Sequence, residues 1–162
     1  MVFYHLSEQF YSDYPSEKYP EMMIKEDRPY TQVITDVNGL KFAIPLRSDI
    51  SHNGNVLWTD KSAKHGLDFT KAVLILDEKY ISDEKVFIRN KEFRHLLGKE
   101  RRVKEKMEKC IGNYKKAKSN IKEEHNAEYC SYSTLRYFEE HIYSEAESDT
   151  GNQLVGAVNV NE

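Results

Sequence analysis

YTQVITDVNGLKFAIPL, the stretch from residue 30 to residue 46, has an alternating apolar run on each side of Asn38-Gly39. This dipeptide is typical of the two-residue type I′ hairpin turn, in which both positions take a positive φ. Counting outward from the turn places apolar residues opposite one another on one face and Asp36 opposite Lys41 on the other. The pairs on the apolar face are Val37 with Leu40, Thr35 with Phe42 and Val33 with Ile44. Both faces agree on one register, so we predict an antiparallel hairpin here.

Shorter segments around the hairpin are expected to extend the sheet. The opening residues MVFYHL predict a short strand, and Ser7 is placed to cap a brief helix over residues 8–14. Composition predicts loops over residues 15–29 and 60–69, a strand at 56–59, and a buried central strand over FTKAVLIL, residues 69–76. Residues 85–88 fit either a short strand or the approach to a helix.

From Asn90 the apolar residues recur at spacings of three and four, which predicts helix, and either Gly98 or Gly112 could divide it. Ser133 is a plausible N-cap for a C-terminal helix over about 133–147. We expect one α+β domain spanning residues 1–162, in which a strongly twisted antiparallel sheet is flanked by helices. Its parts are a sheet core over about 1–88, a basic helical region over about 89–122, the C-terminal helix, and a tail at 148–162 that is either a loose end or an edge strand.

Basic residues are concentrated in one segment of a chain whose net charge is −3. Residues 89–122 carry 13 Lys and Arg against 4 Asp and Glu, a balance of +9, whereas residues 1–88 (10 against 14) and 123–162 (1 against 9) are acidic. Such a stripe is typical of a surface that binds a polyanion. A solvated helix face neutralised by the acidic C-terminal part explains it equally well.

The composition predicts a cytoplasmic globular protein. No apolar run approaches the roughly 20 residues that a membrane span requires, and MVFYH lacks the basic leader and apolar core of a signal peptide. The two cysteines, Cys110 and Cys130, form neither a disulfide ladder nor a zinc motif. Cys110 falls on the apolar face of a predicted helix, which favours a buried free thiol.

PLRSDISH, residues 45–52, gathers polar groups where the second hairpin strand ends. Metal-independent RNA cleavage by the neighbouring 2′-OH needs proton-transfer groups and donors that hold the charged phosphorane. An imidazole can fill either proton-transfer role, while hydroxyls and cations can bind phosphate oxygens. The catalytic candidates are His52, Ser48, Ser51 and Lys71, with Arg47 and Arg28 as further cations.

Each candidate also has an ordinary structural explanation. A histidine beside a turn is more often a hydrogen-bonded structural residue, Ser48 and Ser51 are common turn residues, and Lys71 could extend to the strand edge. The chain contains no glycine-rich phosphate loop, HExxH or GxSxG motif. We therefore expect neither a metal nor a cofactor.

The order of these segments resembles that of the endoribonuclease toxins of bacterial type III toxin–antitoxin systems. This is the ToxN/AbiQ, CptN and TenpN group, and the chain looks most similar to the CptN branch. The matching features are the opening MVFYHLS, Arg28-Pro29-Tyr30 before the hairpin, Pro45-Leu46-Arg47-Ser48 with His52 after it, HGLDFTKA at residues 65–72, and a basic helix behind them.

The resemblance implies a strongly twisted antiparallel sheet, a partly open barrel related to the Kid/MazF-like toxins. It implies metal-independent cleavage of single-stranded RNA to 2′,3′-cyclic phosphate and 5′-hydroxyl ends, in the service of phage defence by abortive infection. It also implies a small pseudoknot RNA antitoxin, cut by the toxin from a repeat precursor, which holds the toxin inactive in a closed toxin–RNA assembly.

By position, Ser48 matches the family's active-site serine. The lysine of the family's Thr-Ser-Pro-Lys pattern is missing here, so we assign proton transfer to His52, supported by Ser48, Ser51 and Lys71. The candidate RNA contacts are Arg28, Tyr30, Arg47, Asp68, Thr70, Arg89, Lys91, Arg94, Arg101, Arg102 and Lys104.

Two other functions fit the same residues. A non-catalytic RNA-binding or regulatory module would share the basic helix and need no acid–base group. A protein-interaction domain would use the amphipathic segment 90–122 and the acidic region after it. No DNA or membrane partner is expected.

Overall fold

A computed structural model describes residues 1–22 and 29–144. Within them an antiparallel sheet of six strands combines with several helices, as the α+β prediction expected. The strands are β1 (Phe3–Tyr4), β2 (Gln32–Val37), β3 (Leu40–Arg47), β4 (Val56–Asp60), β5 (His65–Asp68) and β6 (Val73–Leu74). The α-helices are α1 (Glu8–Asp13), α2 (Asn90–Leu96), α3 (Glu100–Ser119) and α4 (Glu124–Tyr132), and the 3-10 helices are η1 (Phe69–Lys71), η2 (Glu78–Tyr80) and η3 (Thr134–Tyr137).

The β2–β3 hairpin forms in the predicted register. Asn38 and Gly39 have φ values of 52° and 82°, and Val37 pairs with Leu40 while Asp36 pairs with Lys41. Phe42 and Ile44 are completely buried, which confirms that the apolar face turns toward the core. The hairpin is therefore the unit with which β1, β5 and β6 pair.

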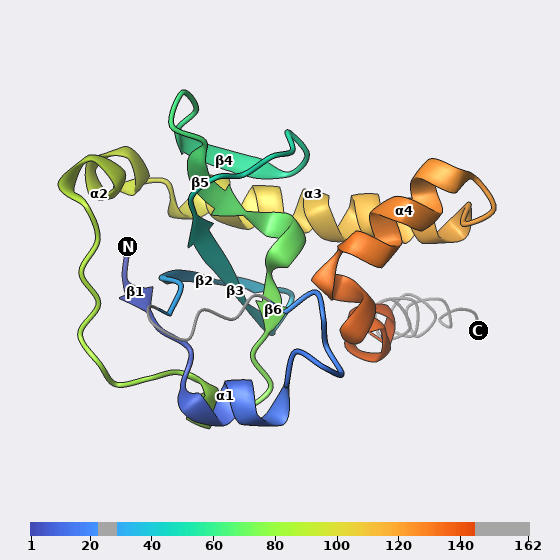
Figure 1. The fold of residues 1–162 in the computed structure, drawn as a ribbon, viewed down its shortest axis with the longest axis horizontal. Coiled ribbons are helices and arrows are strands. Elements are labelled where there is room, and N and C mark those ends of the chain that lie inside the picture. The colour runs from blue at the N-terminus through green and yellow to red at the C-terminus, as the bar shows by residue number, and fades with distance from the viewer. Residues whose placement is uncertain (23–28, 145–162) are drawn as a thin grey trace, which may run out of the picture.

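The strands lie in the order β1-β2-β3-β5-β4, and β6 also pairs with β3. The sheet is not closed, and β1 and β4 are the two ends of this strand order. Figure 1 shows α3 running across the sheet, with α1 at the far end of the molecule and α4 beside the C-terminal part of α3. Among the described residues, β2, η1 and α4 contact α3. The core between these layers includes Phe42, Phe69, Tyr114 and Phe138.

The predicted central strand over residues 69–76 is confirmed only at Val73 and Leu74, which form β6. The side chain of Asp68 accepts a hydrogen bond from the backbone N–H of Thr70 and caps the single turn of η1, so only Val73 and Leu74 remain to pair with β3. The predicted loop over residues 60–69 is confirmed only for the turn at residues 61–64, because Asp60 ends β4 and His65–Asp68 form β5 opposite it. A Cβ on Gly66 would lie 2.6 Å from the backbone oxygen of Leu57, which explains why glycine occupies this close strand contact.

The helical half of the chain differs from its prediction in two neighbouring segments, α4 and the residues that follow it. Gly98, with φ +74°, separates α2 from α3, whereas Gly112 lies inside α3. Ser133 caps η3 instead of a long helix, and among the described residues the chain becomes α-helical again only from residue 139. Helix α4 was missed because it buries one residue fully, Cys130, and so lacks repeated apolar spacing.

Other segments follow their predictions more closely. Ser7 caps α1 through a hydrogen bond from the backbone N–H of Phe10. Residues 85–88 form no strand and instead lead into α2. Arg28 and the tail at 148–162 lie outside the described residues.

Candidate active site

The carboxylate of Asp68 organises a polar cluster at the end of β5. Its side chain is fully buried, and Oδ1 accepts hydrogen bonds from the backbone N–H and the hydroxyl of Thr70 at 3.1 and 2.6 Å. Its Oδ2 atom lies 3.0 Å from Nε2 of His52 and forms an ion pair with Nη1 of Arg47. One carboxylate thus positions three side chains from three segments of the chain.

Strand pairing explains how these segments meet. Arg47 ends β3 opposite Gly66 of β5, two residues before Asp68, and Val56 of β4 pairs with Asp68 itself. The connection from β3 to β4 must therefore cross the end of β5, and His52 lies in this connection. Asp49 and Asn55 take positive φ values of 56° and 52°, which lets the chain turn back within these few residues.

The charges around Asp68 decide which ring nitrogen of His52 is free. Burial by itself would raise the pKa of Asp68, but the hydrogen bonds from His52 and Thr70 and the charges of His52 and Arg47 lower it. An ionised carboxylate can only accept hydrogen bonds, so Nε2 of His52 is the donor. In the neutral ring Nδ1 then keeps its lone pair, and the His52 side chain is 24% exposed. His52 is thus oriented like an imidazole that can accept a proton.

Tyr132, at the C-terminal end of α4, connects His52 to Lys71. Its ring meets the His52 ring edge-on, with 5.5 Å between centroids, and Nζ of Lys71 lies 3.6 Å from the centroid of the Tyr132 ring. Sequence reasoning missed Tyr132, since the polar sequence of α4 predicts no helix and the residue is 80 positions from His52 in a region without a motif.

The ammonium group of Lys71 is paired within the protein and does not extend into solvent. Its Nζ donates hydrogen bonds of 2.7 Å to Oε2 of Glu21 and to the backbone oxygen of Tyr132, and its side chain is 5% exposed. A buried ammonium requires such pairing. The lysine that interrupts an apolar run does have a partner, and its charge is neutralised within the molecule.

Ser48 and Ser51 make no side-chain contact with the Asp68 cluster that the structure records. Ser48 is half-buried and Ser51 is exposed, and neither forms a hydrogen bond with another described residue. Ser48 instead lines a cleft of about 450 Å³ together with Tyr30, Arg47 and Arg89. Arg47 therefore belongs to both places, since it lines this cleft and also pairs with Asp68.

The remaining RNA-contact candidates fall into three groups. Asp68 and Thr70 are buried, so they act on a ligand only through the residues that they hold. Three of the basic candidates contact other side chains: Arg89 lies 3.3 Å from Nδ1 of His65, Lys91 pairs with Asp60, and Arg101 pairs with Glu105. Arg94, Arg102 and Lys104 are exposed on α2 and α3.

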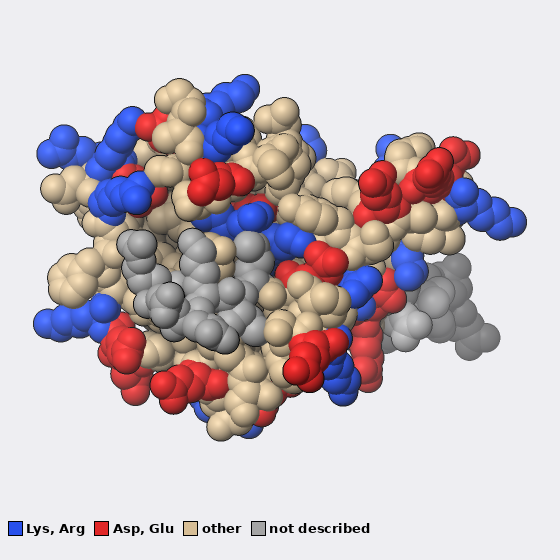
Figure 2. Space-filling view, viewed as in Figure 1, with Lys and Arg blue, Asp and Glu red and all other residues tan. Residues whose placement is uncertain are grey.

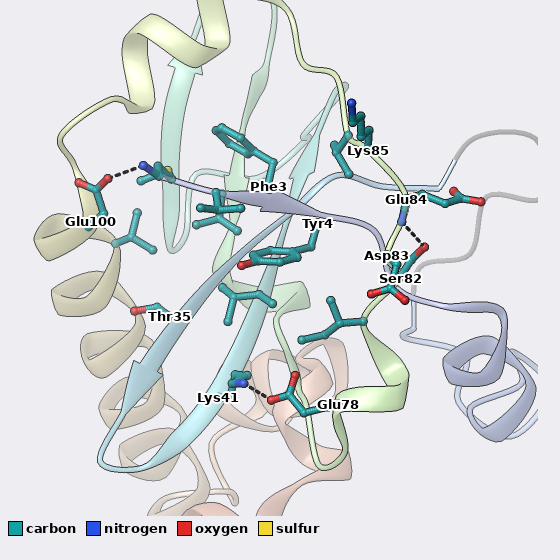
Figure 3. Close-up of a pocket in the computed structure, with 17 residues that line it drawn as sticks. Phe3, Tyr4, Thr35, Lys41, Glu78, Ser82, Asp83, Glu84, Lys85 and Glu100 are labelled. Atoms are coloured by element: carbon teal, nitrogen blue, oxygen red, sulfur yellow. Dashed lines mark hydrogen bonds and ion pairs between the residues drawn. The ribbon is translucent and has the colours of Figure 1, made fainter.

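A larger hollow lies elsewhere in the molecule (Figure 3). Its volume is about 940 Å³, and it is bordered by β1, β2, the segment 81–86 and the first turn of α3. Two ion pairs close its sides, one between the N-terminal amino group and Glu100 at 2.8 Å and one between Lys41 and Glu78. No residue of the Asp68 cluster lines it.

Charge is distributed unevenly over the face seen in Figure 2. Lysine and arginine side chains gather there over the β4–β5 hairpin and α2, whereas acidic side chains predominate around α1.

Cys110 is buried beside Phe69, and burial raises the pKa of its thiol to about 12. The predicted buried free thiol is confirmed, and thiolate chemistry is disfavoured there.

The chain matches no protein-family model, no curated protein and no solved structure. In the part of the chain that the structure describes, no three His, Cys, Asp or Glu side chains gather as metal ligands. None of the described helices has the length and apolar character needed to cross a bilayer.

Proposed function

We propose that this protein is an endoribonuclease that cleaves single-stranded RNA without a metal, and that it is the toxin of a bacterial type III toxin–antitoxin system. The observation that carries the proposal is the His52–Asp68 pair beside Arg47. The buried carboxylate leaves Nδ1 of a partly exposed imidazole as a proton acceptor, and a guanidinium lies next to it. The resemblance of the ordered segments to the CptN branch supplies the rest of the proposal.

In this mechanism His52 removes the proton of the ribose 2′-OH. The 2′-oxygen attacks the adjacent phosphorus, the bond from phosphorus to the 5′-oxygen breaks, and the leaving 5′-oxygen takes up a proton from water. His52 then returns the proton that it removed to the solvent. The products are a 2′,3′-cyclic phosphate and a 5′-hydroxyl. Arg47 neutralises the developing negative charge, and Asp68 acts as the positioning residue that holds His52 in one orientation.

Ser48 and Ser51 enter this proposal as donors to phosphate oxygens after RNA binds. The cleft that Ser48 shares with Arg47 and Tyr30 provides the approach for the strand. Lys71 enters as a positioning residue under Tyr132, because its side chain is buried and it does not line the cleft, whereas Arg47, which also has an ion-pair partner, does.

The finer fold and setting belong to the same proposal. A twisted antiparallel sheet crossed by a long basic helix fits a ToxN-type, Kid/MazF-like fold whose sheet remains open. The partners are a pseudoknot RNA antitoxin and messenger RNA in the cytoplasm, where free thiols such as Cys110 and Cys130 stay reduced.

Cleavage of labelled single-stranded RNA by the purified protein in EDTA tests the reaction class. We expect discrete fragments that end in 2′,3′-cyclic phosphate. Retarded but intact RNA would instead favour the non-catalytic binding module, and cleavage that requires added metal would contradict the mechanism.

Replacing His52 by alanine tests the site itself. Loss of a proton-transfer group lowers rates by about a hundredfold to ten-thousandfold, so His52→Ala is expected to lose that much cleavage while its circular dichroism spectrum stays unchanged. His95→Ala, an exposed histidine on α2, is the matched control. Parental cleavage rates in His52→Ala would rule out this site.

A further inference from the structure

Helix α3 carries its cations on two different edges, although the sequence presents them as one stripe. Arg102, Lys106, Lys109, Asn113 and Lys116 follow one another at spacings of three and four, so they lie along one edge of the helix. We call these five residues the Asn113 edge. Lys115 and Lys118 belong to the other side of the helix, where Lys115 lies over the ring of Tyr143 and Lys118 pairs with Glu139 at 3.1 Å.

The Asn113 edge adjoins the candidate active site. Asn113 donates a hydrogen bond of 3.3 Å to the side-chain oxygen of Asn55, three residues after His52 in the connection that crosses the end of β5. Asn55 in turn donates to the hydroxyl of Tyr129 at 2.8 Å. This edge of α3 is therefore fixed beside the loop that carries the proposed base.

The cations of the Asn113 edge are close to one another and unneutralised. Burial and the charges of Arg102 and Lys109 lower the pKa of Lys106. Within the described residues no carboxylate lies at ion-pair distance from Arg102, Lys106, Lys109 or Lys116, whereas Lys118 is neutralised by Glu139. Repelling cations without counter-charges are stabilised when a polyanion binds along them.

We infer that the Asn113 edge of α3 is a track for the phosphate backbone of an RNA strand that continues from the active site. This inference deepens the proposed function and rests on it. From Arg102 to Lys116 the edge spans about 21 Å at 1.5 Å per residue, which is long enough to contact several consecutive phosphates. Substrate and antitoxin share this backbone chemistry, so the edge serves either RNA.

Two double variants compare the edges of the helix. Lys106→Gln with Lys109→Gln removes two charges from the Asn113 edge, and Lys115→Gln with Lys118→Gln removes two from the other side. Each pair has one half-buried and one exposed lysine on the same helix. Binding of a fluorescein-labelled single-stranded RNA of mixed sequence is measured between 50 and 200 mM salt, with His52→Ala in every protein to prevent cleavage.

Each phosphate contact on a single strand contributes about 0.7 to the slope of log Kd against log salt concentration. We therefore expect the slope to decrease by about 1.4 for the Lys106 and Lys109 variant, and by much less for the Lys115 and Lys118 variant. Equal changes of slope in both variants, or no change in the Lys106 and Lys109 variant, would overturn the inference. The proposed function would not be affected by that result if the parent protein still cleaves RNA. A parent that neither binds nor cleaves RNA would overturn both.

Discussion

At the scale of single residues, Asp68 holds most of the other side chains of the candidate site in place. It is fully buried, yet its two oxygens receive donors from Arg47, His52 and Thr70. A buried carboxylate is tolerated only with such compensation. The same contacts that stabilise the charge also determine which nitrogen of His52 faces outward, so stability and orientation depend on one side chain.

Asp68→Asn should reveal this dependence through the pH profile of stability. The pKa of Asp68 is lowered by folding, so its stabilising contribution is present above the ordinary carboxyl value of about 3.9 and is lost as pH falls through the lower folded value. At pH 7 we expect the variant to lose about 2–4 kcal/mol of unfolding free energy, since Arg47 loses its buried counter-charge.

Urea unfolding from pH 7 down to pH 3 measures the difference between parent and variant. The difference should shrink as the solution becomes acidic. Asp83→Asn is the control, since Asp83 is exposed and forms no ion pair with a described residue, so its loss should matter far less. A difference that grows toward low pH would contradict the sign of the shift.

At the scale of elements, two glycines in the basic helical region have opposite roles. Gly98 has φ +74° at the junction of α2 and α3, whereas Gly112 lies inside α3 with an ordinary helical backbone. A Cβ would meet nothing within 4 Å at either position. Backbone conformation alone therefore distinguishes them.

We expect Gly98→Ala to destabilise the protein by roughly 1 kcal/mol, because an alanine is strained at positive φ. Gly112→Ala should stabilise it by about 0.5–1 kcal/mol, because alanine favours the helix interior. Thermal unfolding followed by circular dichroism compares the two variants directly. Melting temperatures that move in the same direction would contradict this account of the helix break.

At the scale of the whole molecule, Lys71 joins three distant parts of the chain. From η1 it reaches Glu21 in the N-terminal region and the backbone and ring of Tyr132 at the end of α4. The last two contacts place Tyr132 against His52. Tertiary pairing around Lys71 thus fixes one wall of the candidate site.

Lys71→Met should lower the free energy of unfolding by about 1–3 kcal/mol, because it leaves the carboxylate of Glu21 without its partner. The loss stays in this range because Glu21 is partly solvated. Urea unfolding measures the loss, and Lys61→Met, an exposed lysine of the β4–β5 turn, is the control. Unchanged or increased stability in Lys71→Met would show that the ion pair does not hold these segments together.

The candidate site was predictable only in part. His52 and Arg47 stand out because polar groups crowd the end of a strand, and Asp68 and Thr70 lie in a segment that matches the family resemblance. Their mutual contact was not expected, since the region before η1 was predicted as a loop. Tyr132 and Glu21 had no signal of their own, because their positions depend on packing between segments 50 to 80 residues apart in the chain.

By itself the sequence determined the β2–β3 hairpin with its register, the cap of α1 and the apolar face of α3. Each of these depends on contacts between residues a few positions apart, which alternation, turn residues and helical spacing encode. Only the tertiary structure decided that residues 65–68 pair with β4, that the sheet stays open, and that His52, Asp68 and Tyr132 meet. Those outcomes depend on contacts between distant segments, whose free energy is gained only once the core has assembled and which leave no periodic pattern in the chain.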